Sequence, residues 1–443
     1  MAADPKSELP FHLSGNYAPV EKEVEAFDLP VEGAVPPELE GLFVRNGPNP
    51  RKPTNHWFVG EGMLHGVRLE GGRASWYRNR WLRTRVFEEG ATFVGEDGTV
   101  DLTVAAANTH IVRHARRILA LVESSFPTEV TGELATVGCY DFGGRLTTAM
   151  TAHPKTCPVT GELHFFGYAF APPFLTYHRV DASGALVQSE VIEGPGPSMM
   201  HDFAITEKNV IFMDLPIVFS PEDAMEGRFP YAWSDDYGAR LGVMPRGGSS
   251  ADVRWVEIEP CYVFHPLNAF EGEGGAVVLD VCRYPELWRG GAENFASASL
   301  HRFTIDAGAG RVRETPLDDL STEFPRLDER RTGLPNRYGY AVGNRSEAGV
   351  SESTRLLVRY DLETGARETH DFGAGAPGEA VFAPGGPGED EGWLLTYVFD
   401  ERTEGSELQI FDASRIAAGP VARVGLPQRV PFGFHGSWLA DEA

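Results

Sequence analysis

The sequence predicts an all-β protein folded as a closed β-propeller, on three observations. Short apolar runs recur about every ten residues, as they do in chains of antiparallel hairpins. Turn residues separate these runs, and helical periodicity is scarce. The 443 residues contain no low-complexity linker, so one closed ring of short sheets is favoured over several separate sandwiches.

The strand candidates are bounded by turns rich in Gly and Asp. The chain contains 50 Gly and 32 Pro, and Gly and Asx supply the positive φ that tight reversals need. Turns are expected at 70–72, 97–98, 158–161, 181–184, 306–310 and 361–365. Strands are expected at 163–169, 175–180, 276–281, 300–305, 356–360, 393–399 and 408–411.

The length limits the number of blades in the ring. At roughly 50–60 residues for each four-stranded blade, the chain accommodates about six to eight blades. The segment 219–244 is less regular and rich in aromatic residues, which predicts a cap on one face of the ring. We expect residues 1–443 to form a single propeller domain with cap insertions.

Composition and charge exclude several classes of protein. The formal net charge is −25, which would repel a nucleic-acid backbone, so nucleic acid is not an expected partner. Four cysteines without a CxxC pair indicate neither a disulfide scaffold nor a zinc ribbon. The N-terminal residues lack a signal-peptide pattern, and no window reaches the ~18 apolar residues of a membrane span. We therefore expect a soluble, cytoplasmic protein.

Four of the 13 histidines share a local setting. An apolar or small residue precedes each one and a turn-prone or polar residue follows, which indicates a strand end. The four are His153, His201, His265 and His435. They are separated by 48, 64 and 170 residues, close to one, one and three blade lengths. Because a propeller brings blade edges to its axis, the four imidazoles can meet there and bind one metal. The alternative is four hydrogen-bonded core residues.

The residue types narrow the choice of metal. An all-imidazole site favours a borderline divalent ion such as Fe(II) over Mg²⁺ or Ca²⁺, which prefer oxygen ligands. Zinc is also compatible with this ligand type. Metal-bound imidazoles usually donate their second N–H to a carboxylate. Glu123, Glu323 and Glu379 stand in partly apolar stretches and are the candidates, although a Glu beside such a run is commonly a solvated edge residue.

Several separated motifs in the chain resemble those of the carotenoid cleavage oxygenase family. The opening signature covers residues 33–50, 56–58 and 60–63, with Glu61 at a position where Asp is more usual. The later motifs are ANT at 107–109, AHPK at 152–155, MHDF at 200–203, FHPLNAF at 264–270, EFPR at 323–326 and FHGSW at 434–438. Each motif is weak alone, and the resemblance rests on their shared order over nearly the whole chain.

This resemblance implies a seven-bladed propeller with a helical and loop cap over the metal-bearing face. It also implies a non-haem Fe(II) ion on the axis, with Glu123, Glu323 and Glu379 hydrogen-bonded to its ligands. The implied ligands are His153, His201, His265 and His435. Thr109 matches a small residue that the family places beside an open coordination position, and the simpler interpretation is an ordinary strand threonine.

The implied reaction is oxidative cleavage of a conjugated C=C double bond of a carotenoid or apocarotenoid by O₂, which gives two carbonyl products. Such a reaction needs no general acid or base, and the chain contains no GxSxG or HExxH motif. A hydrophobic polyene requires a tunnel of apolar and aromatic side chains. The tunnel candidates, for which core packing is the alternative, are Phe166, Phe219, Phe229, Tyr231, Trp233 and Phe264.

Other functions remain open at this point. Family members that cleave stilbenes and related phenylpropanoids carry a Lys just before the first glutamate, where this chain has Val122, so a carotenoid or apocarotenoid is favoured. A non-enzymatic ligand-binding propeller with structural or zinc-bound histidines is an alternative from a different class. Retinyl ester isomerohydrolase chemistry is less favoured in an acidic chain without an evident membrane anchor. No obligate protein partner is evident, and transient membrane contact through 219–233 has modest support because charged residues interrupt that segment.

Overall fold

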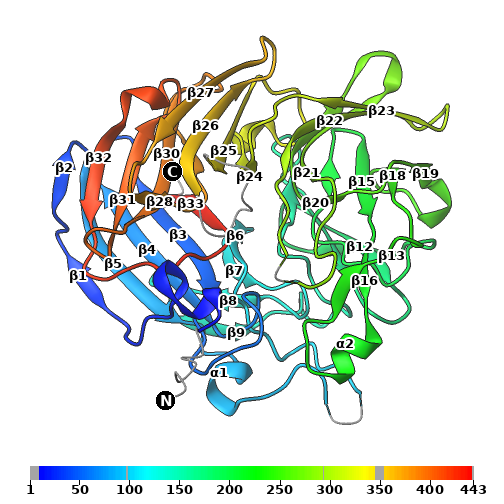
Figure 1. Cartoon of the computed structure of the whole chain (residues 1–443), viewed down its shortest axis with the longest axis horizontal. Helices are drawn as coiled ribbons and strands as arrows, with labels where there is room; N and C mark the ends of the chain where they lie inside the picture. Colours follow the sequence, from blue (N-terminus) through cyan, green and yellow to red (C-terminus); the bar gives the residue numbers. More distant parts are fainter. Residues whose placement is uncertain (1–8, 96–97, 293, 345–353, 442–443) are drawn as a thin grey trace, which may run out of the picture.

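The computed structural model describes residues 9–95, 98–292, 294–344 and 354–441. Seven antiparallel sheets follow one another around a ring, and the colours in Figure 1 run around it in sequence order. The molecule is therefore a seven-bladed β-propeller, which confirms the predicted fold class. All seven predicted strands are present, with boundaries that differ by three residues or fewer.

The blades are numbered along the chain, and the strands of each blade follow in hydrogen-bonding order. Blade 1 contains β33 (Gly436–Ala440), β3 (Gly41–Pro48), β4 (Gly62–Glu70), β5 (Arg73–Trp81) and β1 (Glu25–Phe27). Blade 2 contains β6 (His110–His114), β7 (Arg117–Leu121), β8 (Thr128–Val130) and β9 (Thr136–Cys139). Blade 3 contains β10 (Lys155–Thr156), β11 (Leu163–Tyr168), β12 (Leu175–Val180) and β13 (Leu186–Val191). Blade 4 contains β14 (Ala204–Ile205), β15 (Asn209–Asp214), β18 (Arg240–Pro245) and β19 (Arg254–Glu257).

The remaining three blades complete the ring. Blade 5 contains β20 (Tyr262–Glu271), β21 (Val277–Tyr284), β22 (Ser299–Asp306) and β23 (Arg311–Pro316). Blade 6 contains β24 (Thr322–Arg326), β25 (Tyr338–Asn344), β26 (Thr354–Asp361) and β27 (Ala366–Asp371). In blade 7, β28 (Gly375–Pro377) and β29 (Val381–Pro384) both pair with β30 (Gly392–Asp400), followed by β31 (Gly405–Asp412), β32 (Pro420–Gly425) and β2 (Val31–Gly33).

Both ends of the chain close the ring. The C-terminal strand β33 pairs with β3 of blade 1, from Gly41 opposite Ala440 to Arg45 opposite Gly436. The N-terminal strand β2 pairs with β32 of blade 7. A Cβ atom at Gly436 would lie 2.7 Å from the Val44 carbonyl oxygen, so only glycine allows this close approach. The closure therefore joins residues that are far apart in the sequence.

Burial follows the radial position of each strand. In β20 and β24, near the axis, eight of ten and all five residues are buried, because other strands surround them. In the outer strands β13 and β23, exposed and partly buried residues alternate, as expected for a sheet with one solvated face. The hydrophobic core lies between neighbouring blades: one cluster joins Met213 and Leu241 of blade 4 to Leu279 and Phe303 of blade 5.

The cap contains less helix than expected. In the described ranges, the only α-helices are α1 (Arg85–Glu89) and α2 (Pro221–Met225). The rest of the cap is formed by loops and the hairpin of β16 (Ile217–Phe219) and β17 (Tyr231–Trp233). The expected cap boundary at residue 244 was wrong, because 240–244 belong to β18 of blade 4. Short 3-10 turns lie at Phe11–Leu13, Gly15–Tyr17, Ser250–Asp252, Glu273–Gly275, Glu329–Arg331 and Ile416–Ala418.

The helices of the described ranges are too short and too polar for any of them to cross a bilayer.

Candidate metal centre

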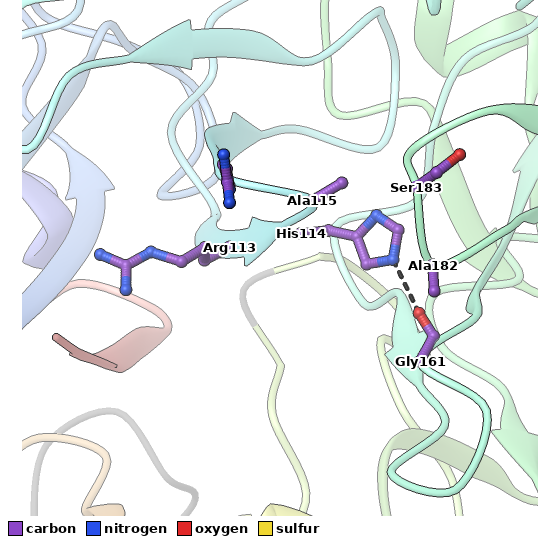
Figure 2. A pocket seen from close by; sticks show the side chains of 7 residues that line it. Arg113, His114, Ala115, Gly161, Ala182 and Ser183 are labelled. Carbon is purple, nitrogen blue, oxygen red and sulfur yellow. Dashed lines mark hydrogen bonds between the residues drawn. The ribbon is translucent and has the colours of Figure 1, made fainter. Parts of the chain in front are cut away.

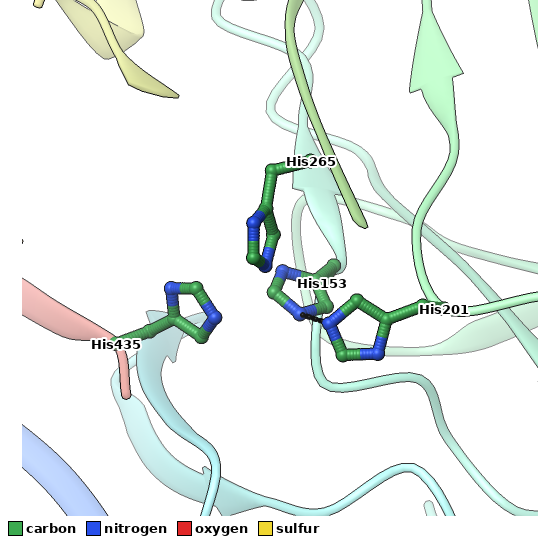
Figure 3. A group of neighbouring side chains, drawn as sticks. All are labelled: His153, His201, His265 and His435. Atoms are coloured by element: carbon green, nitrogen blue, oxygen red, sulfur yellow. Dashed lines mark hydrogen bonds between the residues drawn. The ribbon is translucent and has the colours of Figure 1, made fainter. Parts of the chain in front are cut away.

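Four histidine side chains meet at the centre of the ring. One ring nitrogen from each of His153, His201, His265 and His435 lies within 4.8 Å of the corresponding atoms of the others, and all four residues are buried. We call this group the histidine tetrad. Figure 3 shows the four imidazoles turned toward a common point from separate segments. The convergence expected from their blade-like spacing is therefore observed.

The innermost strand of each blade supplies this region. His153, His201 and His435 stand just before β10, β14 and β33, whereas His265 lies within β20. Glu323 lies within β24, and Glu379 lies in the gap between β28 and β29. His110 is the first residue of β6. Blades 1 to 7 thus contribute, in order, His435, His110, His153, His201, His265, Glu323 and Glu379.

Irregularities in these strands help to turn the side chains inward. The register of β20 against β21 shifts around His265, where Pro266 interrupts the strand. The register of β24 shifts after Glu323, and the next residue, Phe324, has a φ of 51°. Bulges of this kind redirect a side chain and interrupt pairing next to functional sites. Local breaks in pairing therefore accompany two of the site residues.

The three predicted glutamates each contact one histidine of the tetrad. His201 donates its Nδ1–H to Glu123 at 2.8 Å, and His265 donates to Glu323 at 2.6 Å. His435 donates its Nδ1–H to Glu379 at 2.9 Å. Ionised carboxylates only accept hydrogen bonds, so these contacts place the proton on Nδ1 and leave the Nε2 lone pair free for a metal.

His153 has a different environment. Its Nδ1 atom lies 3.6 Å from a carboxylate oxygen of Asp202, which in turn binds the ammonium group of Lys155 at 2.8 Å. Sequence reasoning did not select Asp202 or Lys155. The only sequence signal was their position in the MHDF and AHPK motifs, directly beside two histidines of the tetrad.

Two further residues border the tetrad. The ring of His110 lies 5.3 Å from that of His435 and 5.9 Å from that of His153, between ring centroids. Sequence reasoning missed His110. The backbone carbonyl of Thr109 accepts a hydrogen bond from the His435 N–H at 3.1 Å. Its hydroxyl donates to the side-chain oxygen of Asn108 at 3.1 Å.

The electrostatics favour neutral imidazoles at most of these positions. Burial and the neighbouring histidines hold the pKa of His153 well below its usual value. Burial is the main cause that lowers the pKa of His435 to about 4 and that of His110 to about 3. For His201, burial acts in the same direction, but Glu123 outweighs it and the pKa is raised. Neutral imidazoles can donate a lone pair to a metal, whereas protonated ones cannot.

The donor set and its surrounding charges fit a divalent cation. The Nε2 atoms of His153 and His201 lie 3.0 Å apart, and His265 Nε2 is buried without a hydrogen-bond partner. Four carboxylates, those of Glu123, Glu323, Glu379 and Asp202, contact the tetrad. Two cations contact these carboxylates: Lys155 binds Asp202, and Arg326 lies 3.4 Å from Glu379. Arg326 also binds Glu329, so the side chains around the tetrad carry a net negative charge that a bound cation would offset.

Aromatic side chains form a continuous wall on one side of the tetrad. Phe264 packs edge-on against His201, with ring centroids 5.2 Å apart, and also lies 6.3 Å from Phe58. Phe58 contacts Phe229 at 5.7 Å, and Phe229 contacts Tyr231 at 6.0 Å. Ring contacts thus link four of the predicted tunnel residues to the tetrad. Phe264 contacts it directly, and Phe219, Tyr231 and Phe229 are linked to Phe264 through Phe58.

The other two tunnel candidates lie differently. Trp233 is partly buried against the same hydrophobic cluster, and its indole N–H donates to Asp235 at 3.0 Å. Phe166 packs on Phe203 in a separate core cluster and has no accessible surface, so it lines no space that a water molecule could enter. Phe58 and Trp288 belong to the aromatic wall but were not selected from the sequence, although Phe58 is part of the opening signature.

The molecule is a seven-bladed propeller with four buried imidazoles at its centre, three of them hydrogen-bonded to glutamates. These features place it in the class of β-propeller proteins with a four-histidine site on the axis. The family model described as RPE65, retinal pigment epithelial membrane protein, matches residues 17–440. The chain therefore belongs to this family, that of the carotenoid cleavage oxygenases, as the motifs suggested.

Individual relatives agree with this assignment. A carotenoid cleavage oxygenase of Mycobacterium tuberculosis is 39% identical, with 96% of this chain and 97% of that protein covered. The carotenoid 9,10(9',10')-cleavage dioxygenase 1 of Arabidopsis thaliana is 37% identical, with 98% and 91% covered. The crystal structure of a Pseudomonas brassicacearum lignostilbene dioxygenase is similar with a TM-score of 0.89 at 30% identity, over 99% of this chain and 100% of that one. Cobalt-substituted Synechocystis apocarotenoid oxygenase is similar with a TM-score of 0.85 at 29% identity, over 96% and 97%.

Proposed function

We propose that this enzyme is a non-haem Fe(II) dioxygenase that cleaves a conjugated C=C double bond of a carotenoid or apocarotenoid with O₂, giving two carbonyl products. We also propose that residues 1–443 work as one propeller domain with cap insertions. The observation that carries the proposal is the convergence of the four imidazoles, three of which have their Nδ1–H bonded to a glutamate.

The donor set supports Fe(II) as the cofactor. His153, His201, His265 and His435 would hold the ion through neutral nitrogen ligands, a set that suits borderline divalent metals. The net negative charge around the tetrad favours the binding of a cation. A cobalt-substituted structure exists for the Synechocystis apocarotenoid oxygenase, which is similar to this chain. When bound, the metal would supply the activation of O₂.

The side chains around the metal orient ligands and substrate. Glu123, Glu323 and Glu379 hold the histidine rings and fix their tautomer, so the lone pairs stay directed at the ion. Thr109 carries a methyl group next to the tetrad, where it restricts what can approach the metal. The aromatic wall of Phe264, Phe229 and Tyr231 offers apolar contacts along a polyene, because such a substrate has few polar groups to recognise. No proton transfer by a side chain is required.

Val122 supports a carotenoid or apocarotenoid as the substrate. It directly precedes Glu123 and packs against the hydrophobic cluster between blades 1 and 2. A cation at this position would suit the phenolate of a hydroxystilbene, whereas valine offers only an apolar contact. Two relatives named for carotenoid cleavage are 39% and 37% identical to this chain over nearly its whole length.

Stilbene cleavage remains the second candidate, because the lignostilbene dioxygenase has a closely similar fold over its full length. A cytoplasmic location and transient membrane contact also remain predictions. In the segment proposed for that contact, Met225 is 82% exposed but stands next to charged residues of α2.

The proposal is tested with the iron-loaded protein and a panel of carotenoids, apocarotenoids and hydroxystilbenes in detergent micelles. Mass spectrometry of the products identifies both the substrate class and the bond that is cut, while an oxygen electrode measures O₂ uptake. We expect two carbonyl products from an apocarotenoid or carotenoid and one O₂ consumed per cleavage. Cleavage restricted to hydroxystilbenes would overturn the substrate class. If the protein holds zinc or no metal after anaerobic iron reconstitution and consumes no O₂, the proposed dioxygenase activity would be overturned.

A further inference from the structure

The four histidines of the tetrad are not held in the same way. Three of them donate Nδ1–H to a glutamate at 2.6–2.9 Å. His153 has no such bond, since the 3.6 Å between its Nδ1 and Asp202 is too long for a hydrogen bond. Asp202 can stabilise charge at this distance, but it does not fix the direction of the ring. The orientation of His153 must therefore come from its backbone.

The peptide unit that joins Ala152 to His153 is bonded on both sides. Its carbonyl accepts a hydrogen bond from the Nδ1–H of His110 at 2.7 Å. Its N–H donates to the hydroxyl oxygen of Thr151 at 3.1 Å. His110, Thr151 and Ala152 are all buried, so water does not compete for these bonds. With both groups of this peptide plane bonded, the position of the His153 Cα is restrained, which limits where its ring can lie.

We propose that His110 is a positioning residue for the metal ligand His153. His110 restrains His153 through a hydrogen bond to its backbone, whereas the glutamates restrain the other three histidines through hydrogen bonds to their rings. His110 itself stays outside the tetrad, with its ring 5.9 Å from that of His153 and its Nε2 buried without a partner. This inference rests on the proposed function, because it assumes that the tetrad binds a metal.

The chain offers a matched control on the same strand. His114, at the other end of β6, donates its Nε2–H to the Gly161 carbonyl of blade 3 at 2.9 Å (Figure 2). Both residues line a surface cavity of about 580 Å³. Both histidines are buried and both tie blade 2 to a carbonyl of blade 3. Only the His110 bond reaches the peptide of a tetrad residue. Replacing His114 thus removes an equivalent contact between blades without touching His153.

The experiment compares the full-length variants H110L, H110N and H114L. Leucine removes the donor, whereas the asparagine side-chain nitrogen can take the place of Nδ1. Co(II) affinity is measured by competition with a chelator, and the geometry at the metal by the visible absorption of bound Co(II). We expect H110L to lower the affinity about 10–100-fold and to change the spectrum, with H110N within about threefold of the parent. H114L should keep the parental affinity and spectrum even if it unfolds at a lower temperature.

Two outcomes separate this inference from the proposed function. Parental Co(II) affinity and spectrum in folded H110L would overturn the role of His110 while the metal site stands. Absence of Co(II) or Fe(II) binding by the parent protein would overturn the proposed function itself. If H110L does not fold, H110F carries the test, because a phenyl ring fills the same space without an N–H donor. It should produce the same spectral change, and an unchanged spectrum there would count against the inference.

Discussion

His153 and His201 come from neighbouring blades, and their Nε2 atoms lie 3.0 Å apart. The Nδ1–H of His201 is committed to Glu123, so its Nε2 presents a lone pair toward His153. Since the side chains around the tetrad carry a net negative charge, this arrangement is better satisfied with a bound cation than without one. Metal binding and stability should therefore be linked.

The first prediction concerns this linkage. Added Fe(II) or Co(II) should stabilise the folded protein, by about 2.7 kcal/mol at a hundredfold excess over the dissociation constant. Replacing His265 by Ala should abolish that increment, whereas H301A, at a histidine outside the tetrad, should keep it. Anaerobic thermal unfolding with and without metal measures both. Equal stabilisation of H265A and the parent would contradict a metal site at the tetrad.

The second prediction concerns the glutamates. Glu323 uses one carboxylate oxygen for His265 and the Phe324 N–H, and its other oxygen has no hydrogen-bond partner. The amide group of E323Q can therefore fit with little rearrangement, but it is a weaker acceptor. We expect the metal affinity to fall about 10–100-fold, as for other residues that orient ligands.

A matched control for E323Q exists in blade 5. Glu314 accepts a hydrogen bond from His301 at 2.8 Å, away from the tetrad. E314Q alters the same kind of pair and should leave the metal affinity unchanged, as measured by chelator competition. A similar loss in both variants would indicate a general effect on folding.

The third prediction concerns substrate choice. V122K introduces a cation directly before Glu123. The ratio of kcat/KM for a hydroxystilbene to that for an apocarotenoid should rise at least about tenfold, which corresponds to ~1.4 kcal/mol of differential binding. V122L serves as a control of similar bulk without charge. An unchanged ratio in V122K would show that this position does not select the substrate.

The fourth prediction concerns stability and pH, away from the metal centre. His178 is fully buried, and burial lowers its pKa to about 4. Its folded-state pKa lies below that of the unfolded chain, so its contribution to stability is present above about pH 6.5 and is lost as the pH falls toward 4. In that window, H178Q should reduce the slope of unfolding free energy against pH by up to about 1.4 kcal/mol per pH unit. Denaturant titrations of metal-free protein between pH 4.5 and 7.5 measure the slope, and equal slopes would refute the assignment.

Much of the fold could be predicted from the sequence because turns and apolar runs are local signals. The spacing of His153, His201 and His265 indicated their convergence, since each innermost strand brings one residue to the axis. A closed ring was predicted, but not the strand pairing that closes it, because β33 and β3 lie far apart in the sequence. The end of the cap was misplaced because β18 follows the irregular segment without a clear boundary signal.

The missed site residues share a physical reason. The role of His110 depends on a hydrogen bond to the backbone carbonyl of Ala152. Every residue has a backbone carbonyl, so this acceptor cannot be inferred from the residue type. Asp202 and Lys155 act through a contact between the segment before β14 and the first residue of β10, which becomes visible only once blades 3 and 4 are adjacent. The three glutamates were found because a carboxylate near a ligand histidine is a recurrent residue type at such sites.

The position of His435 directly before the closing strand has a consequence for biosynthesis. Because β33 must reach β3, which precedes it by almost four hundred residues, the fourth imidazole joins the tetrad only after residues 435–440 have been synthesised. A nascent or shortened chain that lacks these residues offers three histidines and an open ring. The complete four-imidazole site is therefore assembled only after this last strand has been made.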